Sequence, residues 1–376
     1  MNGNHNFLTA PYYIAIIRQL ASISRKDKYM AFTTQDVEKK TFSILKVLAN
    51  SPEPQGSIVI ARKLRELGVD LGQRAVRYHL KLTDENGLTY LAGRRDGRQI
   101  TPLGLKELKQ GMVKEKVGLS ITRIDQLAVL TTFDADKQAG LVPVNVSFIR
   151  KQDFQMALQI MAPVFSAHLC ASGLVMEARS GEKIGDIIVP GDTAALVTVC
   201  SIVVNGALLR ACVPVNARFG GLLQMHGHKP WRFVDLIHYA GCSLDPAEVF
   251  IKAKMTSVGQ VVKSGKGSLL ANFHEIPSIC RPTAREISLK LNKAGLNGIF
   301  VVGGVGEPVC EITVESNRAG MVVLGGLNPL AAVQEAGIEV ESYAMSSLIE
   351  YKNLVPFKDL LQRKRFEFHG SPGKRE

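Results

Sequence analysis

The sequence predicts an α+β protein with a small N-terminal domain and a larger mixed α/β domain, and three observations support this division. Residues 37–100 contain three helix-like segments followed by a short two-stranded ribbon. Strand-like and helical segments alternate from residue 116 onward. Charge is divided in the same way, since residues 37–116 hold 16 Lys and Arg against 9 Asp and Glu, whereas residues 117–360 hold 21 of each. A basic small domain beside a neutral large one favours contact with duplex DNA over a chance clustering of surface lysines.

Four segments are expected along the chain: an N-terminal extension at 1–36, a winged helix-turn-helix at 37–114, a larger domain at 115–360 and a basic tail at 361–376. The extension matches neither domain. It is interpreted as an amphipathic segment that packs on a partner, as a disordered leader, or as the consequence of a start codon that belongs at Met30.

The first helix of the small domain is expected over residues 35–50, where apolar side chains recur on one face. The two prolines within residues 51–56 end it, because proline lacks an amide donor and restricts the residue before it. Ser57 is expected to cap a second helix that stops at Gly68.

The third helix follows the turn at residues 69–72, and its Val76, Leu80 and Thr83 are expected to face inward. The side chains expected on the opposite face, as the DNA-binding set, are Gln73, Arg74, Arg77, Tyr78 and Lys81. Arg and Gln form bidentate bonds with guanine and adenine in the major groove, while Lys and Tyr suit phosphates. His79 lies near the core boundary and is interpreted as a packed structural residue.

A hairpin is expected next, with strands at 88–91 and 99–100 around a turn that contains the pair Asp-Gly. Arg94, Arg95 and Arg98 give this wing its charge, which could reach a minor groove or flanking phosphates. A wing used for protein contacts is the alternative. The helix expected at 103–114 suits a linker or a dimer contact.

Composition excludes several classes of protein. No apolar run reaches the roughly 18 residues that a membrane helix needs, since Arg18 interrupts the longest one, and residues 1–6 lack the positive charge of a secretory signal. A cytoplasmic location without membrane contact is therefore expected. The cysteines are widely spaced and read as reduced thiols rather than metal ligands: Cys170, Cys200, Cys212, Cys242, Cys280 and Cys310.

The larger domain shows a series of element patterns. Strands are expected at 117–124, 140–149, 268–273, 298–302 and 309–314, and helices at 152–165 and 283–294. A β-hairpin is expected from strands at 194–204 and 207–215, because Asn205-Gly206 suits a two-residue turn. A similar order of segments recurs later in the chain, which indicates either two similar halves of roughly 110 to 120 residues or hairpin chemistry shared by chance.

No nucleophile elbow, zinc-protease motif or phosphate loop occurs, so no enzyme, cofactor or metal is expected. The glycine-rich residues 303–306 lack the dinucleotide fingerprint and read as a plain turn. Two polar segments place an arginine before a helix or loop, where amides and a guanidinium suit a carboxylate. The effector-binding candidates are Asn216, Arg218, Arg281 and Thr283. Arginines paired with Asp or Glu are the structural alternative.

The chain resembles the NrpR family of nitrogen-regulatory repressors over residues 37–360. The resemblance rests on the wing string GRRDGRQIT with the following PLGLKEL, and on the later strings VNVS, VNGALL, ARFGGLLQ, YAGCSLDPAEVFI, MTSV, FHEIP and GGLNPLAA, in the same order. It implies a homodimeric transcriptional repressor that binds inverted-repeat operators on double-stranded DNA and releases them when 2-oxoglutarate binds the regulatory domain. Some members carry two regulatory domains in tandem, whereas this chain has room for one.

Two other classes of function remain open from the residues. One is an enzyme acting on keto acids whose winged helix docks on a protein. The other is an adaptor or co-repressor that acts through protein contacts with the transcription machinery. For a direct repressor, two recognition helices must lie one helical turn apart, about 34 to 36 Å, to read a palindrome.

Overall fold

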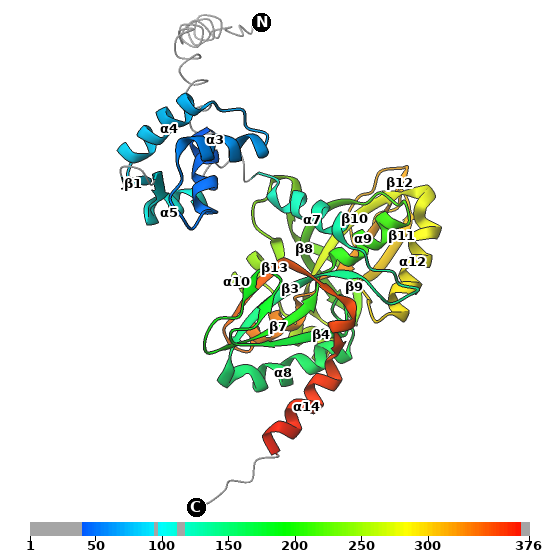
Figure 1. Ribbon diagram of the computed structural model, residues 1–376. Helices are drawn as coiled ribbons and strands as arrows, with labels where there is room; N and C mark the ends of the chain where they lie inside the picture. Colours follow the sequence, from blue (N-terminus) through cyan, green and yellow to red (C-terminus); the bar gives the residue numbers. More distant parts are fainter. Residues whose placement is uncertain (1–39, 94–96, 111–116, 370–376) are drawn as a thin grey trace, which may run out of the picture. The chain divides into compact units, whose positions relative to one another are not determined.

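The computed structural model describes residues 40–93, 97–110 and 117–369, and the chain forms two compact units, residues 1–115 and residues 116–376 (Figure 1). The expected fold class is confirmed, with helices and sheets in both units. The wing arginines Arg94 and Arg95 lie outside the described residues.

The N-terminal unit has the predicted winged-helix order. Its elements are a helix at residues 40–49, α3 (Ser57–Glu66), α4 (Gln73–Glu85), β1 (Thr89–Gly93), β2 (Gly97–Ile100) and α5 (Pro102–Gln110). Ile44, Leu48, Ile60, Leu64 and Leu80 come from the first three helices and form one core. The predicted helical periodicity therefore placed these apolar side chains on the correct faces.

The start of α3 corrects one expectation. Gly56, not Ser57, is the N-cap residue, and no side chain caps the helix. The Ser57 hydroxyl instead accepts bonds from the Gln73 and Arg77 side chains of α4, so it ties the two helices together. The predicted stop at Gly68 is confirmed by its left-handed backbone, with φ of 76°.

The larger unit contains two five-stranded antiparallel sheets. One has the order β13-β3-β7-β4-β14, with β13 (Val340–Glu350), β3 (Leu141–Arg150), β7 (Thr193–Val199), β4 (Leu174–Arg179) and β14 (Val355–Pro356). The other has the order β11-β12-β10-β8-β9, with β11 (Ile299–Val305), β12 (Arg318–Leu324), β10 (Gly267–Pro277), β8 (Asn216–His226) and β9 (Lys229–His238). The small pair β5 (Lys183–Ile184) and β6 (Ile187–Ile188) stands apart from both sheets.

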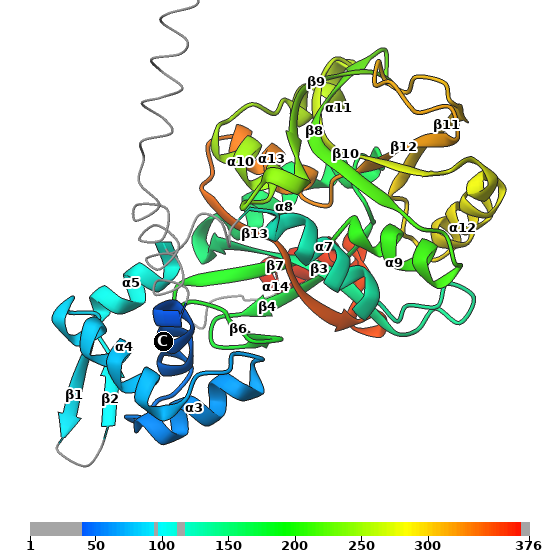
Figure 2. The same cartoon turned by 90° about the horizontal axis from the view of Figure 1, so that it is seen from above.

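The described residues of the larger unit also form eight α-helices. They are α7 (Leu119–Leu130), α8 (Lys151–Ser166), α9 (Ile202–Arg210), α10 (Pro246–Lys252), α11 (Val258–Ser264), α12 (Arg281–Lys293), α13 (Asn328–Glu335) and α14 (Phe357–His369). Two hydrophobic clusters hold the sheets and helices together. In one, α8 and α13 pack with strands of both sheets, and in the other α9 and α12 do so. Figure 2 shows the β8, β10 and β12 sheet with α12 beside it.

The order of elements repeats within this unit, as the similar-halves interpretation expects. The first half runs β3-α8-β4-β7-α9-β8, and the second runs β10-α12-β11-β12-α13-β13. The last strand of each half leaves its own sheet, because β8 pairs with β10 and β13 pairs with β3. The halves therefore exchange a strand. Asn145 on β3 and Asn272 on β10 occupy equivalent positions, opposite Thr198 and Val323.

The hairpin expected around Asn205-Gly206 is wrong, since the segment forms β7 followed by the buried helix α9. Burial overrides the local turn preference here. A Cβ on Gly206 would lie 2.5 Å from the Thr131 Cβ at the end of α7, so glycine lets two helices approach each other.

Two predicted strands are also wrong. Residues 117–124 lie mostly in α7, and residues 309–314 contain only the bridge between Val309 and Ile312. Left-handed backbone at Cys310 and Glu311 turns the chain there, and the strand follows as β12. The strands expected at 140–149, 268–273 and 298–302 and the helices at 152–165 and 283–294 are confirmed.

Candidate nucleic-acid interface and effector cavity

The candidate recognition helix α4 has the two faces that the sequence predicts. Val76, Leu80 and Thr83 are buried, and so is His79, whose Nδ1 lies 3.2 Å from the Thr41 hydroxyl. The side chains of the predicted contact face are exposed at Arg74, Arg77, Tyr78 and Lys81 and half-buried at Gln73. The helix therefore presents two guanidinium groups, a phenol and an ammonium group to solvent.

The polar contacts of that face are weak, and two of them join it to α3. Gln73 Nε2 and Arg77 Nε lie 3.4 and 3.3 Å from the Ser57 hydroxyl. Lys81 Nζ lies 3.7 Å from the Glu85 carboxylate, an exposed pair that contributes little to stability. These weak contacts leave the charged groups free to exchange solvent for another partner.

Arg98 lies on β2 and has an internal partner. Its Nε donates to Asp84 Oδ2 at 2.7 Å, and Asp84 also accepts from the Thr89 hydroxyl. This ion pair links the wing strand to the last turn of α4. The structure therefore places Arg98 as a brace between wing and helix, and its contact with DNA stays a prediction.

The four effector candidates from the sequence come from two elements. Asn216 is exposed at the start of β8, and Arg218 Nη1 donates to the buried Glu275 carboxylate at 2.6 Å. Arg281 begins α12 with a buried Nε that has no hydrogen-bond partner among the described residues, and Thr283 is half-buried nearby. The two segments do not occupy equivalent positions in the two halves, because the counterpart of β8 is β13 and the counterpart of α12 is α8.

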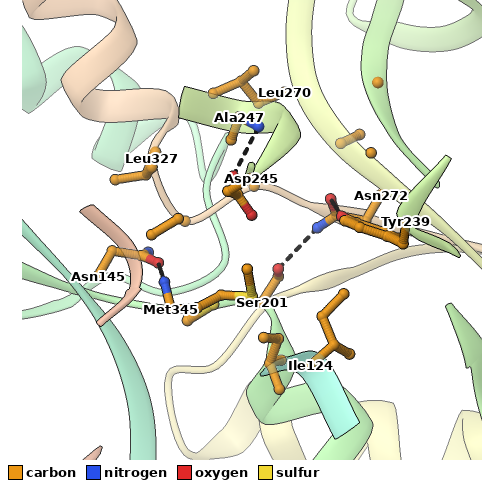
Figure 3. Close-up of a pocket in the computed structure, with 18 of the residues that line it drawn as sticks. Ile124, Asn145, Ser201, Tyr239, Asp245, Ala247, Leu270, Asn272, Leu327 and Met345 are labelled. Carbon is orange, nitrogen blue, oxygen red and sulfur yellow. Dashed lines mark hydrogen bonds between the residues drawn. The ribbon is translucent and has the colours of Figure 1, made fainter. Parts of the chain in front are cut away.

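A small buried cavity of about 30 Å³ lies where the two halves meet, and we call it the junction cavity (Figure 3). The loops after β7 and β12, at residues 200–202 and 325–327, both line it. So do the equivalent residues Asn145 and Asn272. Its volume matches about one water molecule.

Hydrogen bonds hold both asparagines. Asn272 Nδ2 donates to the Ser201 hydroxyl at 2.8 Å, and the Tyr239 hydroxyl donates to Asn272 Oδ1 at 2.7 Å (Figure 3). Asn145 Oδ1 accepts from the Met345 amide at 3.1 Å. The Asn272 side chain thus binds the loop after β7 in the first half, and the Asn145 side chain binds β13, the exchanged strand of the second half. The wall of the cavity therefore contains hydrogen bonds between the two halves.

The titratable side chains that line the cavity and have shifted pKa values include Asp245 and His274. Burial, followed by the charge of Glu248, raises the pKa of Asp245 to about 7. Burial lowers the pKa of His274 to about 4, and neither of its ring nitrogens has a hydrogen-bond partner among the described residues. Asp245 also caps α10, since its Oδ1 accepts from the Ala247 amide at 2.8 Å. The cavity therefore combines a neutral imidazole with a carboxyl group that titrates near neutral pH.

An outer groove of about 380 Å³ shares Asp245, Ala344 and Met345 with the junction cavity. One side of the groove is α7, and the other sides are residues 243–248 and 344–345. Arg123 is the one Lys or Arg among its lining residues, and Asp245 and Glu248 are the acids. The volume suits a small organic ligand, for which pockets start at about 300 Å³.

A third cavity of about 650 Å³ lies between α8, α11 and α13. Its acidic residue, Glu335, already accepts bonds from the Val258 and Gly259 amides at the start of α11. Among the described residues, no group of His, Cys, Asp and Glu is placed to hold a metal ion. None of the described helices is long and apolar enough to cross a membrane.

Sequence reasoning missed Arg123, Asp245, Asn272, His274 and Met345, which the fold brings to the cavity and groove. Two signals pointed toward this region. Asn145 is a buried amide in a mostly apolar strand, and such residues need a specific partner. Asp245 followed by Pro246 is the pattern of a helix cap, which fixes a carboxyl group in place.

Replacement of Asp245 with Asn should change the pH dependence of stability. The folded-state pKa is raised, so the folded protein holds a proton that the unfolded chain has lost, and stability falls as the pH rises from about 4 to 7. Asn stays neutral and can still cap α10. The melting temperature of the variant should exceed that of the natural protein at pH 8, and the difference should be smaller at pH 5.

Fluorescence of Trp231, the single tryptophan, reports the unfolding of this unit. An equal difference at both pH values would contradict the burial of a titrating Asp245.

A winged helix with an exposed basic face, joined to a domain with a ligand-sized groove, defines the class of transcriptional regulators. Comparison with known proteins identifies the family. Residues 117–356 match the family described as NrpR regulatory domains NRD1 and 2, and residues 42–108 match the ribonuclease R winged-helix domain. The chain belongs to the NrpR family of nitrogen regulators.

Named relatives agree with this assignment. The chain is 35% identical over 321 residues to the global nitrogen regulator NrpRI of Methanosarcina mazei, which covers 85% of this chain and 98% of that protein. It is 28% identical to the global nitrogen regulator NrpR of Methanococcus maripaludis and 31% identical to that of Methanocaldococcus jannaschii. Those matches cover 83% and 86% of this chain but span only 54% and 56% of the two relatives.

A solved structure shares the fold of a large part of this chain. The crystal structure of a nitrogen repressor-like protein from Methanococcus jannaschii aligns with a TM-score of 0.54 and 28% identity, over 64% of this chain and 98% of that one. The relatives are named as regulators, so the chain is a regulator and not an enzyme.

Proposed function

We propose that this protein is a DNA-binding repressor of nitrogen-assimilation genes, and that 2-oxoglutarate relieves its binding to the operator. The exposed basic face of α4 is the main observation in support of DNA binding. Its guanidinium groups suit base edges and phosphates, and its buried face seats the helix against α3. The NrpR relatives support a role in nitrogen regulation.

The repressor is proposed to act as a homodimer in the cytoplasm, on an inverted-repeat operator. A palindrome offers two equal half-sites, which a twofold dimer reads when its recognition helices lie about 34 to 36 Å apart. An effector that favours another spacing lowers DNA affinity by its differential stabilisation of the two geometries. Such coupling is typically about 1 to 3 kcal/mol, or roughly 5- to 150-fold.

The proposed binding of 2-oxoglutarate is assigned to the larger unit. 2-Oxoglutarate carries two carboxylates, which a guanidinium binds through paired hydrogen bonds. Arg123 in the outer groove offers such a group. The sequence-derived set of Asn216, Arg218, Arg281 and Thr283 is the competing location, and the partnerless Nε of Arg281 is the observation that favours it.

Footprinting on the DNA upstream of nitrogen-assimilation genes tests both halves. The full chain should protect an inverted repeat, and 2-oxoglutarate at millimolar concentration should weaken that protection by roughly 5- to 150-fold. Glutarate is a matched control, since it has the same five-carbon chain and two carboxylates but no keto group. No specific protection would refute DNA binding, while protection that 2-oxoglutarate leaves unchanged would refute only the effector half.

A further inference from the structure

We propose that the outer groove binds a carboxylate-bearing effector and that Arg123 transmits this binding to α7. The carboxylate takes the guanidinium away from the two backbone carbonyl groups to which it donates in the structure. This inference rests on the proposed function and adds to it a site and a route of transmission.

The present bonds of Arg123 already have the pattern of a bound carboxylate. Its Nε donates to the Met345 carbonyl at 3.0 Å, and its Nη2 donates to the Ser346 carbonyl at 3.1 Å. One edge of the guanidinium therefore meets two neighbouring oxygens, as it does in a bidentate ion pair. The bonds to the carbonyl groups draw on the charge of the guanidinium alone, whereas a carboxylate adds an opposite charge and forms a bidentate ion pair, so a carboxylate should displace the carbonyl groups.

The carbonyl groups belong to a bulge in β13 that other side chains hold. Tyr343 pairs with Val146 and Ser347 with Val144, so residues 344–346 stand opposite Asn145 alone. Met345 has a φ of 52°, in the left-handed region that disfavours a residue with a Cβ. Such a conformation persists only where its surroundings enforce it.

The bulge is enforced from three elements. The Ala344 amide donates to Glu248 Oε1 of α10 at 2.7 Å, and the Met345 amide donates to Asn145 of β3. Arg123 of α7 holds the two carbonyl groups. Loss of the Arg123 bonds removes the restraint that α7 supplies, so the bulge can relax toward ordinary backbone angles.

Helix α7 is positioned to respond to a relaxation of the bulge. Its Ile124 and Leu127 share a hydrophobic cluster with Met345 and Tyr239. Ser120 fixes the start of the helix, since its hydroxyl donates to the Leu244 carbonyl at 2.8 Å, one residue before Asp245. In the sequence, α7 is the first described helix after α5 of the winged-helix unit. A shift of the bulge therefore reaches the segment that leads to the DNA-binding unit.

The acids of the groove determine how the ligand lies. Asp245 accepts from the Ala247 amide and Glu248 from the Ala344 amide, so each carboxylate has one occupied oxygen. Glu248, and Asp245 when it is ionised, repel a negative charge. One carboxylate of the ligand is consequently directed to Arg123, away from the junction cavity.

Arg123→Gln in the full chain tests the inference by calorimetric titration with 2-oxoglutarate and by fluorescence anisotropy with operator DNA. Gln can still donate to a carbonyl but lacks the charge. The variant should bind 2-oxoglutarate at least about tenfold more weakly. Without effector, its DNA affinity should already be reduced toward that of the effector-saturated natural protein, since uncharged Gln restrains the two carbonyl groups more weakly than Arg123 does.

Three further variants complete the test. Arg285→Gln removes an exposed positive charge from α12 and is the matched control, which should keep natural affinities for 2-oxoglutarate and DNA. Arg281→Gln tests the competing location. Arg123→Lys keeps the charge without the bidentate edge, so it should regain part of the effector affinity of Arg123→Gln. Circular dichroism and Trp231 fluorescence establish that each variant is folded.

The outcomes separate the inference from the proposed function. Natural effector affinity and DNA release in both Arg123 variants would overturn the inference alone, as would loss of effector binding in Arg281→Gln with retention in Arg123→Gln. No binding of 2-oxoglutarate by the natural protein would defeat the effector half of the proposed function and this inference with it.

Discussion

Replacement of Gly326 with Ala should destabilise the larger unit by about 3 kcal/mol or more. Gly326 follows β12 and lines the junction cavity. A Cβ at this position would lie 2.1 Å from the Val199 carbonyl oxygen and 2.7 Å from Asn145 Nδ2. The first contact is with strand backbone, so relief requires the end of β7 to move. That movement would also disturb the asparagine that holds the Met345 amide.

Thermal unfolding followed by Trp231 fluorescence measures the effect. For a domain of this size, 3 kcal/mol corresponds to a loss of roughly 6 to 12 °C in melting temperature. Gly173→Ala is the matched control, because no atom lies within 4 Å of a Cβ added there and its φ is not in the left-handed region. The control should be neutral or slightly stabilising. A Gly326 variant no less stable than the control would show that β7 and the loop after β12 are not in close contact.

The sequence predicts the N-terminal unit well because its signals are local. Val76, Leu80 and Thr83 follow one another at helical spacing, and the Asp-Gly pair marks the turn of the wing. Each element is completed within a few residues of the pattern that encodes it. The exception is the pairing of Gln55 with Arg98, which joins the proline-containing break to β2 and which no periodicity indicates.

The larger unit is harder to predict because its pairings join distant segments. Strands β8 and β10 pair although about fifty residues of sequence separate the paired positions, and β13 pairs with β3 across about two hundred residues. Local preference also misleads at Asn205-Gly206, where a turn sequence lies inside a buried helix. The glycine is needed for its contact with Thr131, which only the folded chain reveals.

The candidate site combines both difficulties. Arg123, Asn145, Asp245 and Met345 each come from a different element, and the exchange of strands between the halves brings them together. The sequence directed attention to Arg218, but the buried Glu275 engages that guanidinium. An arginine in a turn is a weak signal for a ligand, because neutralising a buried carboxylate demands the same side chain.

Replacement of both Arg74 and Arg77 with Ala should reduce affinity for the operator by roughly 100-fold, since each bidentate contact contributes about 1 to 3 kcal/mol of discrimination. Both side chains are exposed on α4, and the buried Val76 and Leu80 keep the helix seated without them. The loss should be smaller on unrelated DNA, where base contacts contribute nothing. The slope of log affinity against log salt should fall by about one for each phosphate contact that is lost.

Fluorescence anisotropy with labelled operator, at several salt concentrations, measures both quantities. The matched control is Lys229→Ala with Lys266→Ala, which removes two exposed positive charges from the larger unit and leaves α4 unchanged. A loss of the same size in both double variants would mean that net charge alone drives binding. Specific binding unaffected by the α4 changes would remove this helix as the reading element and leave the wing as the remaining candidate. A loss confined to the α4 variant would assign operator reading to this helix, because only a face with base contacts weakens specific binding more than non-specific binding.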